Sequence, residues 1–260
     1  MQTILFHETV FGPIHSRRLG TSLGVNLSPV DGKICTFDCL YCEAGYNAQG
    51  PGRSGLPTRS AVRKALSAKL QAMSEGGERL DVITFSGNGE PTVHPEFAGI
   101  IDDTIALRDR FFPDVKISVL SNSTQLHRAD VCEALRRVDN NIVKLDSAVE
   151  STMRALDRPT SPAFTVATVV PRLAQFAGNA IVQTMFTRGI HNGIAVDNTT
   201  EAEVDALIEA YRQIRPASIM VYSIDRRTPE QSLQKVDGAE LRTIAARISD
   251  ATGIPVQVTA

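Results

Sequence analysis

Three of the four cysteines in the chain lie within eight residues of one another. Cys35, Cys39 and Cys42 follow at steps of four and three residues, so one loop can gather three thiolates around a compact centre. Thiolates are soft ligands that suit iron–sulfur clusters and zinc. Structural zinc sites use four protein ligands, usually in paired Cys-x-x-Cys units, and the sequence has no second pair. Three thiolates on a four-iron cluster would instead leave one iron open to a small molecule.

A glycine-rich turn and several polar residues offer further chemistry. Residues 87–91 read Gly-Asn-Gly-Glu-Pro, and the two glycines permit positive φ angles and close approach of a ligand to the backbone. Glu90 adds a carboxylate that can hold an ammonium group. Asn122 and Asp146 each follow an apolar run, and Gln183 lies within one. For these three residues the alternative is local hydrogen bonding or strand capping.

The apolar runs predict the elements that position these residues. Six short runs rich in β-branched residues alternate with helical patterns, which is typical of a parallel sheet covered by helices. Such strand–helix units form either an open doubly wound sheet or part of a (β/α) barrel. In both folds the chemistry belongs on the loops after the carboxyl ends of the strands. The predicted strands are residues 23–27, 82–85, 115–120, 142–145, 180–186 and 217–222.

Start and stop signals predict three of the helices. Ser60 is expected to cap a helix that ends at the glycine pair 76–77. Residues 200–203, Thr-Glu-Ala-Glu, form a predicted capping box for a second helix, and residues 237–240 repeat the pattern for a third. Cys132 lies in a further helical pattern, where we expect a buried small apolar residue rather than a ligand.

The cysteine spacing, Cys-x-x-x-Cys-x-aromatic-Cys with Tyr41 as the aromatic residue, resembles the signature of the radical S-adenosylmethionine (SAM) enzymes. The resemblance implies that Cys35, Cys39 and Cys42 hold a [4Fe–4S] cluster whose open iron chelates SAM. It further implies that one electron cleaves the sulfonium and that the resulting 5′-deoxyadenosyl radical abstracts a hydrogen from the substrate. The family fold is α/β, a partial (β/α)6 TIM-like barrel of parallel strands. We therefore expect a single radical SAM domain over residues 1–260, with a core at about 20–225 and N-terminal and C-terminal extensions packed on it.

The glycine-rich turn is similar to the Gly-Gly-Glu-Pro motif of this family, which holds the amino group of the methionine moiety of SAM. The first glycine is displaced in this chain, so the match implies a binding stretch without fixing each contact. That stretch is Gly87, Asn88, Gly89 and Glu90. The resemblance implies the same cofactor-binding role for Tyr41, Asn122, Asp146 and Gln183.

Two pairs of arginines flank the predicted barrel. Arg17 and Arg18 precede the first strand, and Arg226 and Arg227 follow the sixth. In a partial barrel these strands are the edges, and guanidinium groups there can clamp a carboxylate or phosphate of the substrate. The alternative is that these arginines face solvent. Residues 43–57 are expected either to cover the cofactor or to form a mobile connector.

Residues 10–235 together resemble a group of stand-alone radical SAM proteins that is distantly similar to the wyosine-forming tRNA enzymes. Those tRNA enzymes need a second cluster, and this chain has only Cys132 to spare. The net charge of −2 also disfavours RNA, which is bound through many phosphate contacts. We therefore expect a small-molecule or peptide substrate and an electron donor such as flavodoxin or ferredoxin. The alternatives are an enzyme that modifies tRNA or activates a glycyl-radical partner, and a non-catalytic iron–sulfur or zinc module.

The composition is that of a globular protein. Hydrophobic residues make up 42% of the chain and charged residues 22%, which excludes a disordered or coiled-coil chain. The sequence has no run of 18 apolar residues that could span a membrane and no visible secretory signal. Tightly spaced cysteines without such a signal favour metal binding in a reducing cytoplasm.

Overall fold

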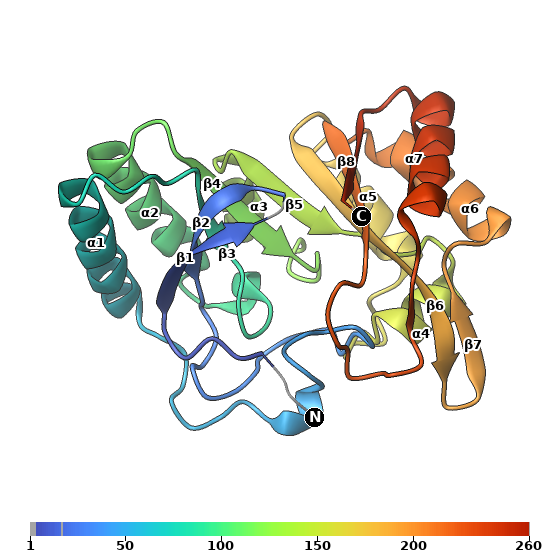
Figure 1. Cartoon of the computed structure of the whole chain (residues 1–260), viewed down its shortest axis with the longest axis horizontal. Helices are drawn as coiled ribbons and strands as arrows, with labels where there is room; N and C mark the ends of the chain where they lie inside the picture. Colours follow the sequence, from blue (N-terminus) through green and yellow to red (C-terminus); the bar gives the residue numbers. More distant parts are fainter. Residues whose placement is uncertain (1–3, 17, 260) are drawn as a thin grey trace.

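The structure, a computed structural model, describes residues 4–16 and 18–259. Its centre is a curved sheet whose seven described parallel strands lie in the order in which they occur along the chain (Figure 1). The two ends of the sheet do not pair with each other in the described residues, so the barrel stays open. The fold is the partial barrel that the sequence predicts. The parallel strands are β2 (Gly20–Val25), β3 (Val82–Phe85), β4 (Lys116–Ser121), β5 (Asn140–Lys144), β6 (Ala180–His191), β8 (Ser218–Ser223) and β10 (Val256–Thr259).

All six predicted strands are present, but the edges of the sheet are not where the sequence places them. β1 (Val10–Ser16) pairs antiparallel with β2, and β10 pairs in parallel with β8. The first and sixth predicted strands are therefore interior strands, which corrects the prediction that they form the edges. β1 escapes prediction because Pro13 interrupts its apolar pattern, and an edge strand tolerates this. β10 escapes because its sequence, Val-Gln-Val-Thr, forms no continuous apolar run.

The end of β6 extends beyond the parallel sheet. Residues 188–191 pair antiparallel with β7 (Ile194–Asp197), and residues 187–188 pair with β9 (Gln234–Lys235). The β6–β7 hairpin projects toward the side of the molecule where the loop after β2 lies (Figure 1). The carboxyl ends of the strands are thus surrounded by irregular segments and one hairpin.

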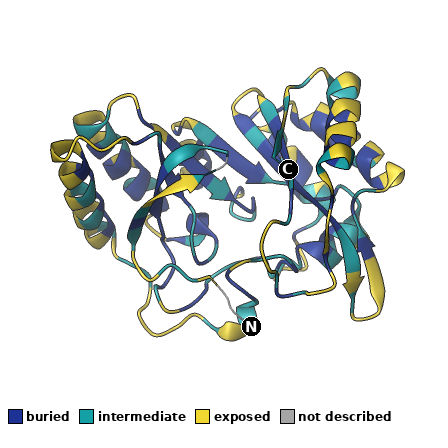
Figure 2. Cartoon of the chain, viewed as in Figure 1, coloured by how far each residue is buried: buried dark blue, intermediate teal, exposed yellow. Residues whose placement is uncertain are grey.

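Helices cover the outer face of the sheet, with their buried sides turned toward the strands (Figure 2). α1 begins one residue after Thr58, whose side chain accepts a hydrogen bond from the amide of Ala61; the cap is therefore Thr58 and not Ser60. No helix in the described residues is long and apolar enough to cross a membrane. The helices are α1 (Arg59–Glu75), α2 (Phe97–Phe111), α3 (Ala129–Arg136), α4 (Glu150–Leu156), α5 (Val166–Ala174), α6 (Glu201–Ile214) and α7 (Gly238–Thr252), with 3-10 turns η1 (Asn47–Gln49) and η2 (Pro91–Val93).

The predicted capping box at the start of α6 is only half formed. Thr200 accepts from the amide of Glu203, as predicted. The carboxylate of Glu203 turns inward instead and accepts a hydrogen bond of 2.6 Å from the hydroxyl of Ser147. Asp237 caps α7 as predicted, through the amides of residues 239 and 240. A tertiary contact therefore outweighs the local capping pattern at Glu203.

Candidate functional site

The three cysteines lie on the loop that joins β2 to α1, and all of them are free thiols. Backbone hydrogen bonds fix the loop at two points. The amide of Ile34 donates to the carbonyl of Asn88 at 3.1 Å, and its carbonyl accepts from the amide of Glu90 at 3.0 Å. Farther along, the amide of Leu40 donates to the carbonyl of Leu156 at 3.0 Å. The loop is thus held between the turn after β3 and the end of α4.

The surroundings of two of the thiols disfavour the thiolate form. Burial, followed by the negative charge of Glu90, raises the pKa of Cys35 to about 11. Burial raises the pKa of Cys39 well above its ordinary value, although the charge of Lys144 opposes this. Cys42 and Cys35 also raise the pKa of Cys39, so the three sulfurs lie within electrostatic reach of one another.

A bound metal would reverse this preference. A coordinated thiol loses its proton because the cation supplies the positive charge that the buried site lacks, and binding releases that proton. In the part of the chain that the structure describes, no group of three or more His, Cys, Asp or Glu side chains closes around a single ion. Three thiols spread along one fixed loop fit a polynuclear iron–sulfur centre, in which each thiolate binds a different iron.

The turn after β3 requires both of its glycines. Gly89 has a φ of +145°, and a Cβ there would lie 1.8 Å from the carbonyl oxygen of Ile34. A Cβ on Gly87 would lie 2.4 Å from Oδ1 of Asn26. The turn and the cysteine loop therefore approach each other too closely for any side chain at these two positions.

Asn88, between the two glycines, has a side chain that is used within the protein. It is fully buried, and its Nδ2 donates to the carbonyls of Phe6 at 2.8 Å and Pro29 at 2.9 Å. Its Oδ1 accepts from the amide of Phe6 at 2.8 Å. Both of its donor hydrogens are therefore engaged, and the residue ties the N-terminal segment to the turn.

Glu90 is also engaged within the protein. One carboxylate oxygen accepts from the amide and the hydroxyl of Thr92, and the other accepts from the amide of Asn122 at 2.6 Å. Burial raises the pKa of Glu90, and the hydrogen bonds oppose that rise. The carboxylate thus braces the glycine turn against the end of β4.

Asn122, the residue after β4, connects this brace to a cysteine. Its Nδ2 donates to the hydroxyl of Thr36 at 2.9 Å and lies 3.6 Å from Sγ of Cys35. Its Oδ1 accepts from the amide and the hydroxyl of Thr124. The alternative from the sequence, local hydrogen bonding, is therefore present at Asn122, together with a sulfur contact that the sequence does not predict.

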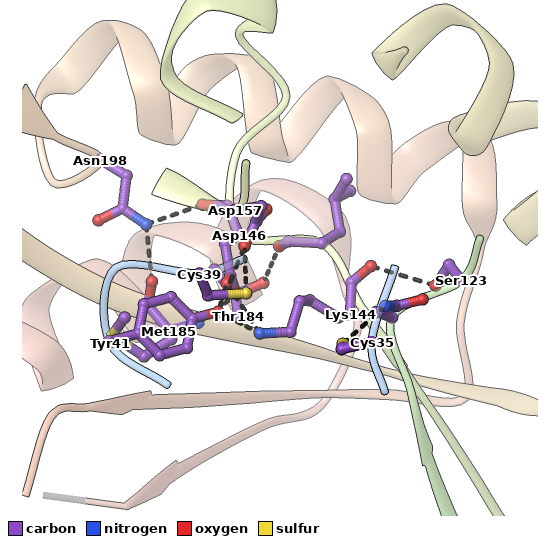
Figure 3. A network of polar contacts seen from close by, with 12 residues as sticks. Cys35, Cys39, Tyr41, Ser123, Lys144, Asp146, Asp157, Thr184, Met185 and Asn198 are labelled. Carbon is purple, nitrogen blue, oxygen red and sulfur yellow. Dashed lines mark hydrogen bonds and ion pairs between the residues drawn. The ribbon is translucent and has the colours of Figure 1, made fainter. Parts of the chain in front are cut away.

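A second polar cluster lies at the end of β5 (Figure 3). Lys144 Nζ lies 3.3 Å from Oδ2 of Asp146, Lys144 also donates to the hydroxyl of Tyr41, and Tyr41 donates to Asp146. Burial, the largest single influence, lowers the pKa of Lys144, but the surrounding negative charges, led by that of Asp146, together outweigh it and hold this pKa well above its ordinary value. The other oxygen of Asp146 accepts from the amide of Met185 at 2.9 Å. Lys144 and Asp146 therefore form a buried ion pair that Tyr41 joins to the cysteine loop.

Asp157 belongs to the same cluster, although nothing in the sequence analysis singles it out. It is 1% exposed, and its Oδ1 lies 3.7 Å from Sγ of Cys39 and 3.3 Å from the hydroxyl of Tyr41. Burial and then the charge of Asp146 raise the pKa of Asp157 well above its ordinary value. Asp157 follows α4 rather than a strand, so a search of strand ends misses it. The one available signal is a carboxylate at a helix carboxyl end, where the helix dipole disfavours it.

The remaining predicted cofactor residue, Gln183, lies beside Lys144 in the register of β5 and β6. It is 7% exposed, and its backbone carbonyl accepts from the amide of Leu145 at 3.1 Å. No described residue forms a hydrogen bond with its side-chain amide. Among the predicted cofactor side chains, Gln183 therefore keeps its hydrogen-bonding groups for another partner.

Three of the four predicted arginines lie in the described residues, and they do not gather on one partner there. Arg17 lies outside the described residues. Arg18 lies in the turn between β1 and β2, and its guanidinium carbon is 4.5 Å from the centroid of the Tyr222 ring on β8. Arg226 forms a 2.6 Å ion pair with Glu43, and Arg227 is exposed.

The segment after the cysteines is attached to the turn that precedes them. Asp31 accepts hydrogen bonds from the hydroxyl of Ser54 at 2.7 Å and from the amides of Arg53 and Ser54 at 2.8 and 3.1 Å. These bonds, led by that of the Ser54 hydroxyl, lower the pKa of Asp31 to about 2. The amide of Lys33 also donates to the carbonyl of Gly50 at 3.0 Å. Residues 50–54 are thus held on the turn at Asp31; a covering role for residues 43–57 stays a prediction.

Comparison with known proteins places these residues in one family. The model of the radical SAM superfamily matches residues 30–170, more than half of the 260-residue chain, and this range includes the cysteine loop, the glycine turn and Asp157. The UPF0026 protein slr1464 of Synechocystis sp. is 29% identical over 274 residues, with 95% of each chain covered. A protein of Brachyspira hyodysenteriae named GTPase Obg is 24% identical over 237 residues. That match covers 90% of this chain but 32% of the Brachyspira protein, so this chain spans about a third of that relative.

Solved structures share the fold at low sequence identity. A radical SAM methyltransferase from Sphaerobacter thermophilus has a TM-score of 0.65 at 14% identity, covering 92% of this chain and 65% of the other. TYW1 with a lysine–pyruvate adduct bound has a TM-score of 0.62 at 14% identity, covering 90% and 75%. Streptococcus suis SuiB bound to its precursor peptide SuiA has a TM-score of 0.64 at 13% identity, covering 91% and 48%.

Proposed function

The chain belongs to the radical SAM superfamily, and from this premise we propose that Cys35, Cys39 and Cys42 hold the [4Fe–4S] cluster of a SAM-dependent enzyme. Members of this superfamily are enzymes that use such a cluster and SAM, so a non-catalytic zinc or cluster module is not retained. The observation that carries the residue assignment is the fixed loop with three free thiols, of which Cys35 and Cys42 both act on the pKa of Cys39. When bound, the reduced cluster and SAM together supply the radical that removes a hydrogen from the substrate.

We assign the SAM contacts of the glycine turn to its backbone. The side chains of Asn88 and Glu90 are already engaged by protein groups, which favours an indirect role for both. Gly87 and Gly89 are themselves partly exposed, which leaves their backbone groups accessible to a ligand. Gln183, with a side-chain amide that has no partner in the described residues, is the proposed side-chain contact.

Three other predicted cofactor residues are proposed to act by positioning. Tyr41 and Asp146, joined to each other and to Lys144, would hold the second half of the cysteine loop in place. Asn122 would orient Cys35 and donate toward its sulfur. Hydrogen bonds to ligating sulfurs tune the potential of an iron–sulfur cluster, so these residues would affect reduction as well as geometry.

A small molecule or a peptide is the proposed substrate class, and hydrogen abstraction is the proposed first step of its reaction. The net charge of −2 supports this class because it gives no general attraction for nucleic acid. The fold likeness to SuiB bound to a precursor peptide is compatible with a peptide. The fold likeness to TYW1 keeps a tRNA substrate as the second candidate. Electrophoretic titration with bulk tRNA at 50 and 200 mM salt separates the two, and binding that weakens steeply with salt would favour tRNA.

Anaerobic reconstitution with iron and sulfide tests the cluster assignment. We expect about four irons per chain in the wild-type protein. The variant Cys39→Ala should lose most of this iron, whereas Cys132→Ala is the matched control and should retain it, since Cys132 lies on the buried face of α3. Equal iron loss in the two variants would contradict the assignment of the ligands.

Reduction of the loaded protein with dithionite in the presence of SAM tests the activity. Formation of 5′-deoxyadenosine and methionine, measured by mass spectrometry, is the expected result. A fully loaded protein that leaves SAM intact under these conditions would overturn the proposed function.

A further inference from the structure

Arg18 reaches across the open barrel from one end of the sheet to the other. It lies in the turn between β1 and β2, at the start of the parallel sheet, whereas Tyr222 lies on β8 near the last strand. The guanidinium carbon of Arg18 is 4.5 Å from the centroid of the Tyr222 ring, which is the geometry of a cation–π contact. The turn that joins β1, a strand that the predicted six-stranded barrel does not include, to β2 thus carries a positive charge onto β8.

Among the residues that the structure describes, this guanidinium has no counter-ion. Its Nη1 is buried and has no hydrogen-bond partner, and no described carboxylate forms an ion pair with Arg18. A buried polar group without a partner is costly, more so when it is charged, and contact with an aromatic ring recovers only part of that cost. An unpaired guanidinium in this position is therefore suited to an anion that arrives with a ligand.

The ring under Arg18 faces the same interior as the cluster at the end of β5. Burial raises the pKa of Tyr222, and the charges of Lys144, Asp146, Arg18 and Cys39 all act on it. Tyr222 also lies beside Met185 in the register of β6 and β8, and the amide of Met185 donates to Asp146. Arg18 and Tyr222 therefore lie within electrostatic reach of the polar cluster at the end of β5.

The balance of charge selects the kind of anion. Lys144, the other cation that acts on Tyr222, is already paired with Asp146 at 3.3 Å. Arg18 therefore leaves one unbalanced positive charge among the described residues around Tyr222. The planar guanidinium carries a single positive charge, which matches a carboxylate better than a phosphate dianion. The second charge of the dianion would stay unpaired.

We propose that Arg18, stacked on Tyr222, binds a carboxylate of the substrate and so fixes the position of one end of the substrate. The inference rests on the proposed function, because it names the substrate class of the same enzyme. The carboxylate belongs either to a small molecule or to the C-terminus of a peptide, and both would bind the guanidinium of Arg18 in the same way.

Saturation-transfer NMR with simple probes tests the inference on the cluster-loaded protein with SAM. The probes are acetate, its uncharged analogue acetamide, and methyl phosphate. We expect acetate to bind the wild type about tenfold more tightly than acetamide, the ratio that one charge-assisted hydrogen-bond pair supplies. Tri-alanine and its C-terminal amide test a peptide as the ligand. Tighter binding of tri-alanine than of acetate would identify a peptide as the source of the carboxylate.

Two variants and a matched control make the test specific. Arg18→Gln should abolish the preference for acetate over acetamide. Arg110→Gln is the control, because Arg110 also stacks on an aromatic ring, Phe111 at 4.9 Å, but on the exposed surface of α2; it should keep the preference. Should Arg18→Gln fold poorly, Tyr222→Phe and Tyr222→Leu replace it, with the preference retained by Phe and reduced by Leu.

The outcomes separate this inference from the proposed function. If the wild type forms 5′-deoxyadenosine but Arg18→Gln binds acetate as tightly as the wild type does, the carboxylate site alone is overturned. Tighter binding of methyl phosphate than of acetate would overturn the choice of anion. A loaded wild type that leaves SAM intact would overturn the proposed function, whatever acetate does.

Discussion

Two carboxylates near the cysteine loop have the same kinds of hydrogen-bond partner and opposite pKa shifts. Asp31 accepts from two backbone amides and one serine hydroxyl, and its pKa falls to about 2. Glu90 accepts from two backbone amides and one threonine hydroxyl, yet its pKa is raised. Asp31 is exposed and Glu90 is 3% exposed, so burial, not the number of donors, decides the direction.

Asp146 adds a third case to this comparison. It is as buried as Glu90, at 1% exposure, but it has a cation, Lys144, beside it. The glycine turn thus holds its buried carboxylate with neutral donors, while the end of β5 holds its carboxylate with an ion pair. Four substitutions test this difference between the two sites, from the largest expected effect to the smallest.

Removal of the cation should have the largest effect. Lys144→Met leaves the charge of Asp146 buried without its partner, which typically costs about 3–5 kcal/mol of unfolding free energy. Urea unfolding measures this loss. The double variant Lys144→Met/Asp146→Asn removes both charges and should recover much of it. A double variant no more stable than the single one would show that the ion pair does not account for the loss.

A side chain in the glycine turn should have the next largest effect. Gly89→Ala places a Cβ against a backbone carbonyl at a φ of +145°, and we expect a loss of about 2–4 kcal/mol in urea unfolding. Gly178→Ala is the matched control, because Gly178 has a φ of +76° with no atom within 4 Å of the added Cβ. It should cost about 1–2 kcal/mol, the strain of a left-handed residue alone. Equal losses in the two variants would argue against the close approach at Ile34.

The raised pKa of Glu90 makes a smaller, pH-dependent prediction. A carboxyl whose folded pKa lies above its ordinary value contributes most to stability at pH values below 4.5 and loses that contribution as the pH rises through the folded pKa. Glu90→Gln lacks this titration. The unfolding free energy of the variant relative to the wild type should therefore increase from pH 4.5 to pH 8. A constant difference over this range would mean that Glu90 does not titrate as its burial requires.

Asp31 should show the opposite dependence and the smallest effect. Its folded pKa of about 2 lies below the ordinary 3.8, so its contribution is present above pH 3.8 and is lost as the pH falls toward 2. Asp31→Asn should therefore match the wild type at pH 2 and be less stable at pH 6. Thermal unfolding at the two pH values measures this. A variant as stable as the wild type at pH 6 would contradict the contribution of Asp31 to stability.

The sequence predicts the parts of this molecule that depend on local pattern. All six apolar runs became parallel strands because a strand buried on both faces needs an apolar run. The cysteine spacing and the glycines of the turn were identified for the same reason, since thiolate ligands and close backbone approach each demand one residue type.

The parts that the sequence does not predict depend on long-range contacts. Asn88 and Glu90 carry side chains that suit a ligand, but partners 82 and 32 residues away along the chain already engage them. Asp157 meets Cys39 across 118 residues, and no local pattern marks that meeting. The edge strand β10 was missed because its polar and apolar residues alternate, so that it lacks the continuous apolar run of the buried strands.

The attachment of the cysteine loop to α4 has a consequence for protein synthesis. Leu40 and Cys39 contact Leu156 and Asp157, which a ribosome adds more than a hundred residues later. At ordinary elongation rates this interval lasts roughly 10 s. During that time the nascent thiols have neither their final shelter nor their neighbouring acid, and oxygen can reach them. The cluster is therefore best inserted after residue 157 has emerged from the ribosome.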